Sequence, residues 1–458
     1  HSEERLLTPK MRIGDKLVDC TWDEALAVVA TNLKVIQGKR GADSIGGLGS
    51  TRTMNEDAYV FQKFLRTVVG TNNVDMLARL RVPKGLDTAF FAGELAKIGR
   101  HDAVLVLDSD VGELNPYMGI EIVRAVNKHG KKLVLVNRDF NKFNKIASAV
   151  IEKTTTDALD GLVAALSGKG GDALKEAVDI LKAAKSVALI VPGTLSDKEY
   201  AKVKELSGML QGVTHYPIVR RSNFQGSLDM GTHPGFYPGY QPVNPETTTV
   251  HAGAWNAILS DTPGMNAVEM VNGIKSGKVS ALYVMGDDPV GSDPRLGETF
   301  SKLEFLVVQD IFLTETAKLA HVVLPAASVV EKQGTFTNLE RRLQQLAQAE
   351  PPIAESKPDW EILQLLAKKM GGSMNYASSR DILREIRSVV PQYKDLAPGA
   401  VWPKEASPLA GKDIDLSLAS DAIMKNDVIT SERLLFSSGM TITRSAEIGT
   451  IRHIKIEA

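Results

Sequence analysis

Short apolar runs alternate along the chain with stretches of helical spacing. The clearest example is the run AVLVL at 103–107 and the run KLVLV at 132–136, which flank a helical pattern at 120–128. A buried strand, a helix and a second buried strand in this order form a βαβ unit with parallel strands. Other runs of this kind lie at 187–191, 281–284 and 305–309. The pattern predicts an α/β fold with mostly parallel strands.

Capping residues and glycines indicate where other elements begin and end. Thr21 followed by Glu24 is a capping-box pattern, which predicts a helix over the apolar positions that follow. A second helix is predicted at 359–370, where two glycines stop it. Between 220 and 245, glycines and prolines are too dense for regular structure, and a loop of this length usually carries function. Residues 376–458 are interpreted as a connector followed by short strands, predicted at 441–443 and 453–456.

Composition excludes several classes of function. The formal net charge of the 458 residues is −1, which gives no reason to expect nucleic acid as a partner. No apolar run reaches the ~18 residues that cross a bilayer, so no direct membrane span is predicted. The single cysteine, Cys20, excludes an iron–sulfur cluster held by four cysteines of this chain and favours a reducing compartment. The eight histidines show no spacing typical of a zinc site.

Polar turns follow the predicted strands. In open α/β sheets, ligands bind beyond the carboxyl ends of the strands, where backbone N–H groups hold phosphate and carboxylates hold ribose hydroxyls. The chain contains neither G-x-G-x-x-G after a strand nor a Walker A sequence, so a standard NAD or ATP site is not expected. Glycine and aspartate also occur at turns without any ligand, which leaves a structural alternative for each turn. The candidate residues are Asp108, Ser109, Gly112, Asn137, Arg138, Gly286, Asp287 and Asp288.

Several segments, taken in their order, make the chain recognisable. They are WDEAL at 22–26, NE at 55–56, GTNNVD at 70–75, NFQG at 223–226, PGYQ at 238–241, MGDDP at 285–289, QD at 309–310, HVVLP at 321–325 and EKQGTFTNLERR at 331–342. Together they resemble the molybdopterin oxidoreductases, from about residue 6 to about residue 371. The segment around Gln225 looks like the loop that formate dehydrogenases of this family place over the pterin.

The resemblance implies two Rossmann-like domains facing each other across a cleft. One is discontinuous, over 1–77 plus 223–375, and the other is inserted at 78–222. A molybdopterin guanine dinucleotide in the cleft would contact the polar turns named above together with Gln309 and Asp310. His233, in the glycine-rich segment, is interpreted as stabilising that loop rather than as catalytic.

The chain departs from the family at the position of the metal ligand. Catalytic formate dehydrogenases carry cysteine or selenocysteine after Ala-Arg-Leu, whereas here Ala78, Arg79 and Leu80 are followed by Arg81. Arginine stays protonated and has no lone pair to offer a metal. We therefore expect no catalytic residue of this kind and no metal held by a side chain of this chain. In such proteins, iron–sulfur clusters belong to a cysteine-rich region that would precede this segment.

The loss of the metal ligand resembles the large peripheral-arm subunit of NADH-quinone oxidoreductase (complex I). This branch implies the body of a redox-complex subunit without molybdenum catalysis, bound to other subunits of the peripheral arm. It also implies a cytoplasmic protein held at the inner membrane by its partners, with either no cofactor or the pterin dinucleotide. The alternatives are the pterin domains of a formate dehydrogenase-like molybdenum or tungsten enzyme, and a non-catalytic α/β scaffold with an empty cleft.

Overall fold

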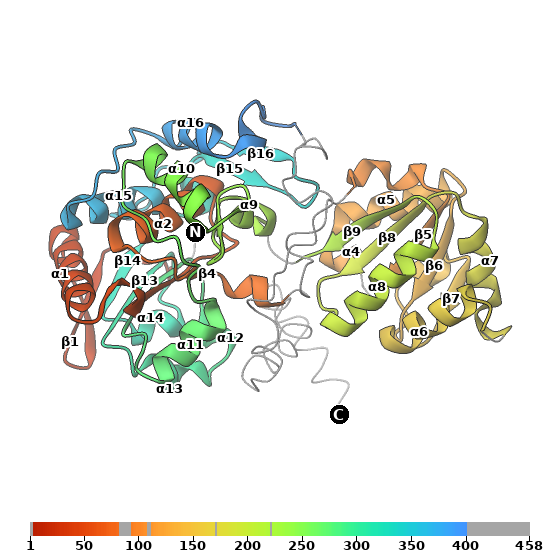
Figure 1. Cartoon of the computed structure of the whole chain (residues 1–458), viewed down its shortest axis with the longest axis horizontal. Helices are drawn as coiled ribbons and strands as arrows, with labels where there is room; N and C mark the ends of the chain where they lie inside the picture. Colours follow the sequence, from red (N-terminus) through yellow and green to blue (C-terminus); the bar gives the residue numbers. More distant parts are fainter. Residues whose placement is uncertain (1–2, 82–92, 108–110, 170–171, 220–221, 401–458) are drawn as a thin grey trace. The chain divides into compact units, whose positions relative to one another are not determined.

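The computed structural model describes residues 3–81, 93–107, 111–169, 172–219 and 222–400. They belong to two compact units (Figure 1). Of the described residues, 3–81, 222–338 and 342–400 belong to unit 1, and those between 93 and 219, together with 339–341, belong to unit 2. Each unit has a sheet with parallel strands covered by helices, so the fold is mixed α/β as predicted. The strands predicted at 441–443 and 453–456 lie outside the described residues.

Seven strands form the sheet of unit 1, in the order β2-β1-β14-β13-β12-β3-β4. The five from β14 to β4 are parallel, and β1 and β2 form an antiparallel hairpin at one edge. Their bounds are β1 (Lys10–Ile13), β2 (Lys16–Asp19), β3 (Ile45–Leu48), β4 (Val74–Asp75), β12 (Ala281–Met285), β13 (Phe305–Asp310) and β14 (Val322–Pro325). The strand order reverses between β3 and β12. The carboxyl ends of strands border a crevice at such a switch point.

Helices of unit 1 cover both faces of this sheet. One face packs against α11, α13 and α14, and α1 lies over the other face together with α2 and α15 (Figure 1). The capping box of Thr21 and Glu24 is present at the start of α1, as predicted, and α15 ends at Gly371. The helices are α1 (Trp22–Arg40), α2 (Asn55–Phe64), α9 (Phe224–Asp229), α10 (Pro245–Trp255), α11 (Ala267–Lys275), α12 (Pro289–Ser292), α13 (Leu296–Phe300), α14 (Glu315–Leu319), α15 (Asp359–Met370) and α16 (Ser379–Val389).

Two segments expected to be irregular contain regular structure. The glycine-rich segment 220–245 holds the short helix α9 and a hairpin of β10 (Phe236–Tyr237) and β11 (Gln241–Pro242). Gly231 and Gly239 both have positive φ and turn the chain between these elements. The segment after 376 contains α16, which packs against α2. A second hairpin, earlier in the chain, is made by β15 (Gly334–Thr337) and β16 (Leu343–Leu346). The dense glycines therefore shape tight turns between short elements.

Unit 2 has a five-stranded parallel sheet in the order β7-β6-β5-β8-β9, with its switch point between β5 and β8. Apolar clusters fill both faces, as the continuous apolar runs predict. The strands are β5 (Ala103–Leu107), β6 (Lys132–Val136), β7 (Ala149–Ile151), β8 (Val187–Pro192) and β9 (Val213–Ile218). The helices are η4 (Leu95–Arg100), α4 (Val111–Leu114), α5 (Pro116–Asn127), α6 (Thr155–Leu166), α7 (Lys175–Ala183) and α8 (Asp197–Met209).

Candidate functional site

Two turns meet at the switch point of unit 1. Gly286 follows β12 with a φ of +67°, and Ser50 and Thr53 belong to the turn that follows β3. A Cβ atom placed on Gly286 would lie 3.0 Å from Thr53 Cγ2 and 3.4 Å from Ser50 Cβ. Only glycine combines this left-handed backbone with so close a neighbour. The predicted turn at 286 thus packs directly on a second turn, at 50–53, that the sequence did not single out.

Three buried polar atoms near these turns have no hydrogen-bond partner among the described residues. They are Thr51 Oγ1, Thr232 Oγ1 and His233 Nε2, on side chains exposed by 3% or less. The segment that carries Thr232 packs on the turn after β3, since a Cβ on Gly49 would lie 2.9 Å from Thr232 Cγ2. Burying a hydroxyl without a partner costs about 1–3 kcal/mol in proteins. Such atoms at a switch point fit a site whose ligand supplies the missing partners.

The partner of the other ring nitrogen determines the tautomer of His233. Its Nδ1 accepts a hydrogen bond from the Gly235 backbone N–H at 3.0 Å. Burial lowers the pKa of His233 well below its usual value, and the nearby Arg79 and Arg66 lower it further. The ring is therefore neutral and carries its proton on Nε2, which makes Nε2 a hydrogen-bond donor.

Arg66 holds the segment that carries His233 in place. Its Nη2 donates to the backbone carbonyls of His233 at 2.8 Å and Phe236 at 2.9 Å. The guanidinium stacks over the Tyr237 ring, with 4.7 Å from Cζ to the ring centroid. Burial lowers the pKa of Arg66 to about 10, so the side chain stays charged at neutral pH. The glycine-rich segment is thus anchored by a buried cation bonded to carbonyl oxygens.

Asp310 ends β13, the next strand along the same edge. Its carboxylate accepts hydrogen bonds from the backbone N–H groups of Ile311 at 2.7 Å and Phe312 at 3.1 Å. Burial raises the pKa of Asp310 to about 7, although these two hydrogen bonds and the charge of Arg52 act in the opposite direction. A carboxyl group poised in this range can accept or donate a proton at neutral pH. Arg52 itself is exposed on the turn after β3 and offers a positive charge to an anionic ligand.

Gln309 points into a buried polar network in the core. The Tyr283 hydroxyl donates to Gln309 Oε1 at 2.6 Å, and Gln309 Nε2 donates to Asp359 Oδ1 at 2.7 Å. Asp359 in turn pairs with Lys332, which also bonds Asp57 Oδ2 at 2.6 Å. Both functions of the Gln309 amide are therefore satisfied by the protein, and its role here is to join β12, β13 and α15.

The other candidates in unit 1 also have protein partners. Asp288 Oδ1 accepts hydrogen bonds from Gly291 N at 3.1 Å, Thr316 N at 2.9 Å and Thr316 Oγ1 at 2.6 Å, which ties α12 to α14. Asp287 is buried beside it. Gln225 Nε2 donates to Asp229 Oδ1 at 2.8 Å and to the Tyr240 hydroxyl at 2.7 Å. Gly286 and Asp310 are the predicted residues that lie at the carboxyl ends of β12 and β13, where these strands border the switch point.

The candidates of unit 2 lie on turns beyond its own strands. Asn137 Nδ2 donates to Asp139 O at 2.8 Å and to Asn144 Oδ1 at 3.0 Å, so this side chain shapes the turn after β6. Arg138 is exposed, with no ion pair to any described residue. Gly112 lies in α4, close to Gly119 of α5. Asp108, Ser109 and the side chain of Arg81 lie outside the described part of the structure.

Two kinds of feature were sought among the described residues and not found there. Nowhere in the described ranges do three His, Cys, Asp or Glu side chains come together as a possible metal site. No helix within those ranges is both long and apolar enough to cross a membrane.

Comparisons with known proteins agree on the family. The model of the family described as "Molybdopterin oxidoreductase" matches residues 5–369. The chain is 32% identical over 471 residues to the F420-dependent formate dehydrogenase 1 subunit alpha of Methanococcus maripaludis, covering 88% of this chain and 69% of that protein. It is 33% identical over 451 residues to the NADPH-Fe(3+) oxidoreductase subunit alpha of Geobacter sulfurreducens, covering 86% of this chain and 52% of that protein.

Solved structures show the same fold at low sequence identity. Acetylene hydratase from Pelobacter acetylenicus superposes with a TM-score of 0.56 at 15% identity, over 84% of this chain and 64% of that chain. The formyltransferase/hydrolase complex of Methylorubrum extorquens gives a TM-score of 0.52 at 13% identity, over 79% of this chain and 98% of that chain. The family match covers most of the chain, and the fold agrees with it: the chain belongs to the molybdopterin oxidoreductase family.

Proposed function

We propose that this chain is the pterin-binding body of a formate dehydrogenase-like oxidoreductase subunit. The observation that carries the proposal is a set of three buried polar atoms without a described partner. They are Thr51 Oγ1, Thr232 Oγ1 and His233 Nε2, on the turn after β3 and on the segment that packs against it. Two hydroxyls and one N–H donor suit a ligand rich in ring nitrogens, carbonyls and phosphate oxygens, which a pterin dinucleotide is.

Each residue has a distinct part in holding the cofactor. The hydroxyls of Thr51 and Thr232 and the N–H of His233 would bind the polar edges of the ligand. The Gly286 turn allows close approach of the backbone, and the exposed Arg52 would pair with a phosphate. When bound, such a cofactor would carry molybdenum or tungsten and would supply two-electron redox chemistry.

The relatives support the formate dehydrogenase alternative over the assignment to complex I. Those named above are subunits of formate dehydrogenase and of an NADPH-Fe(3+) oxidoreductase. We therefore do not retain the complex I placement or the membrane association that depended on it. Because these relatives are named as alpha subunits, we propose that this chain also works beside further redox subunits.

By resemblance to catalytic formate dehydrogenases, Arg81 occupies the position of their metal-ligating cysteine or selenocysteine. Since a guanidinium cannot ligate a metal, we propose that the chain binds the cofactor without supplying a ligand from this position. The chain spans 69% of the F420-dependent relatives and about half of others, so these proposals concern the part present here.

Two readouts on the natively purified complex test the function. We expect pterin, measured by fluorescence after oxidation, close to stoichiometric with this chain. With formate as the electron donor, we also expect this chain in its wild-type form to contribute no dye reduction. The Arg81→Cys variant should gain this activity. Absence of pterin would overturn the binding role. Formate oxidation by the wild type at the rate of Arg81→Cys would overturn the inference drawn from Arg81.

A further inference from the structure

Helix α5 of unit 2 exposes a row of large apolar side chains. Tyr117, Ile120 and Val123 are 50%, 55% and 40% exposed. Their spacing of three residues places them on adjacent turns along one face of the helix. Met118 and Ile122 on the opposite face are buried in the core of unit 2. Among the described helices, no other exposes three large apolar side chains.

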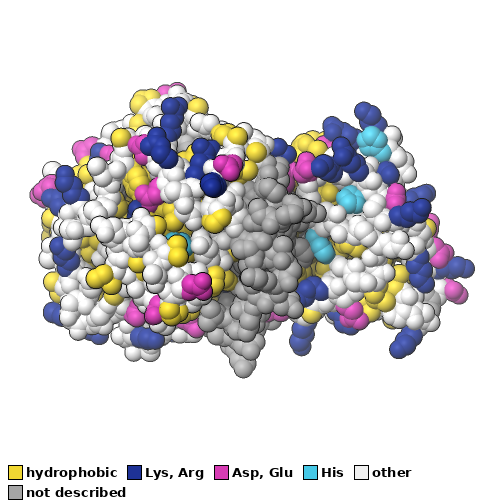
Figure 2. Space-filling view, turned by 45° about the horizontal axis from the view of Figure 1, so that its top comes forward, with side chains coloured by type: hydrophobic (Ala, Val, Ile, Leu, Met, Phe, Trp, Pro, Cys, Tyr) yellow, Lys and Arg dark blue, Asp and Glu magenta, His cyan; other side chains and the backbone are white. Residues whose placement is uncertain are grey.

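The same face becomes cationic toward the end of the helix. Arg124 follows Ile120 by four residues, and Lys128 follows Arg124 by four, so all three lie in one row. Lys128 and His129 are exposed, with no ion pair to any described residue. Figure 2 shows lysine, arginine and histidine side chains gathered with hydrophobic ones along one edge of this unit.

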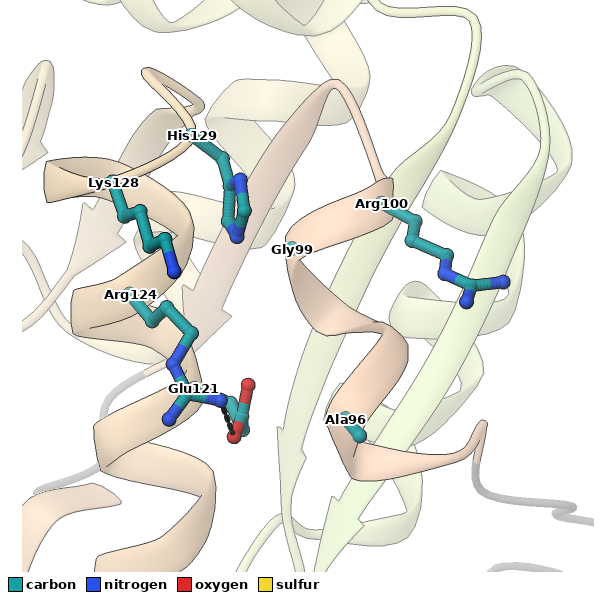
Figure 3. A pocket seen from close by; sticks show the side chains of 7 residues that line it. All are labelled: Ala96, Gly99, Arg100, Glu121, Arg124, Lys128 and His129. Atoms are coloured by element: carbon teal, nitrogen blue, oxygen red, sulfur yellow. Dashed lines mark hydrogen bonds and ion pairs between the residues drawn. The ribbon is translucent and has the colours of Figure 1, made fainter.

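A hollow lies beside this cationic end, between α5 and η4 (Figure 3). Its volume is about 460 Å³. The side chains of Lys128 and His129 point toward it, whereas Arg100 points away. Arg124 is half-exposed and donates to Glu121 Oε1 at 2.7 Å, while Glu121 itself is buried. Glu121 thus holds the Arg124 guanidinium in place, and Lys128 adds a further positive charge to the lining of the hollow.

Helix stability and ordinary surface composition explain the separate cations and apolar residues of this face, but not their arrangement in one row. Cations in the last turn of a helix stabilise it through the helix dipole, by about 0.3–1 kcal/mol each. Single exposed apolar residues are also normal on a protein surface. Neither effect explains a continuous row that is apolar over two turns and cationic over the next. Apolar anchors bordered by charges of one sign are typical of a protein interface.

We propose that the α5 face, made of Tyr117, Ile120, Val123, Arg124 and Lys128, docks an acidic, amphipathic segment of a partner subunit. Charge complementarity selects this occupant. The same face of a second copy would offer cations rather than carboxylates to Arg124 and Lys128, so it would not complement their charge. The proposal does not depend on cofactor binding, because none of these five residues is proposed to hold the cofactor.

Zero-length cross-linking tests the chemistry of the occupant. A carbodiimide joins lysine amines to carboxylates in direct contact, and mass spectrometry locates the joined residues. In the natively purified complex, we expect Lys128 linked to an aspartate or glutamate of another kind of chain, together with slowed hydrogen exchange over 117–128 relative to the isolated chain. Links from Lys128 to a second copy of this chain would overturn the proposal. Fast exchange over 117–128 in the complex would do the same.

Charge reversal gives a second, independent readout. Ile120→Glu and Lys128→Glu should each weaken the association with the cross-linked partner at least about tenfold, as hot-spot residues do. The loss for Lys128→Glu should shrink at high salt. The matched controls Met209→Glu and Lys182→Glu change exposed residues in the last turns of α8 and α7 of the same unit. A docking role would be contradicted if the control variants weakened the association as much as the α5 variants did. It would also be contradicted if the α5 variants left the association unchanged.

Discussion

Thr232→Val should change the stability of the protein and its affinity for the cofactor in opposite directions. Valine has nearly the shape of threonine but no hydroxyl, and Thr232 Oγ1 is buried without a described partner. Removing an unpartnered buried hydroxyl recovers its desolvation cost, about 1–3 kcal/mol. The cofactor-free protein should therefore gain up to that much stability. Thr51→Val should behave alike, because Thr51 Oγ1 is also buried without a described partner.

The bound state should respond in the other direction. A hydrogen bond from the Thr232 hydroxyl to the ligand contributes about 0.5–1.5 kcal/mol net, so its loss should weaken cofactor binding roughly 2- to 10-fold. Together, the two effects should narrow the gap in stability between the loaded and the cofactor-free protein.

Urea denaturation followed by tryptophan fluorescence measures the first effect, on protein expressed in cells that cannot make the pterin. Pterin retained after prolonged dialysis of the loaded protein measures the second. Thr249→Val is the control, since Thr249 is exposed on α10 and donates to Pro245 O at 2.8 Å. Two results would show that Thr232 does not face a ligand: a less stable cofactor-free Thr232→Val protein, or pterin retention equal to that of Thr249→Val.

Three further changes test the network, the buried acid and the turn. Lys332→Met leaves two buried carboxylates without their cation and should cost about 3–5 kcal/mol in urea denaturation, against less than about 1 kcal/mol for the exposed pair changed by Lys318→Met. Burial raises the pKa of Glu56 to about 7, so folding favours its protonated form, and that stability is lost as pH rises through about 7. Glu56→Gln should therefore exceed the wild type in stability at pH 8, by up to about 3 kcal/mol, and lose this advantage at pH 5. An equal advantage at both pH values would contradict the burial argument. Gly286→Ala and Gly277→Ala should each cost about 1–2 kcal/mol, because both positions have positive φ, but only Gly286→Ala should lower pterin content. Equal pterin content in the two variants would contradict a role of the Gly286 turn in cofactor binding.

Local signals in the sequence predicted the elements well. The apolar runs of β5, β6 and β13 mark strands buried on both faces, and the capping box at Thr21 marks the start of α1. These features depend on neighbours in the sequence, which a pattern can reveal. The edge of the sheet where Gly286 and Asp310 lie followed from the rule that parallel strands end together.

Contacts between residues that lie far apart in the sequence could not be predicted. Gln309 ends a strand like a ligand-binding residue, yet its amide is satisfied by Asp359, 50 residues away. Asp288 is held by Thr316, 28 residues away. Thr51 carries no motif, and its importance comes from burial without a partner, which only the packed structure reveals. Hydrogen bonds between side chains that are distant in the sequence cannot be predicted from the spacing of neighbouring residues.

The position of Arg81 shows how a single departure can mislead the choice of branch. The absent metal ligand favoured a complex I subunit, whereas comparison over most of the chain favours formate dehydrogenase-type relatives. A ligand residue can change without altering the body that surrounds it, because packing and ligation depend on different side chains. Family membership followed from the whole sequence, and the role at one position needs its own experiment.

An experimental structure of the natively purified protein, with its ligand in place, would decide whether unit 1 holds the pterin. We expect pterin dinucleotide density at the switch point of unit 1, with ligand atoms about 2.7–3.2 Å from Thr51 Oγ1, Thr232 Oγ1 and His233 Nε2. Density bound elsewhere, with these three atoms bonded to the protein or to water, would contradict the proposed site.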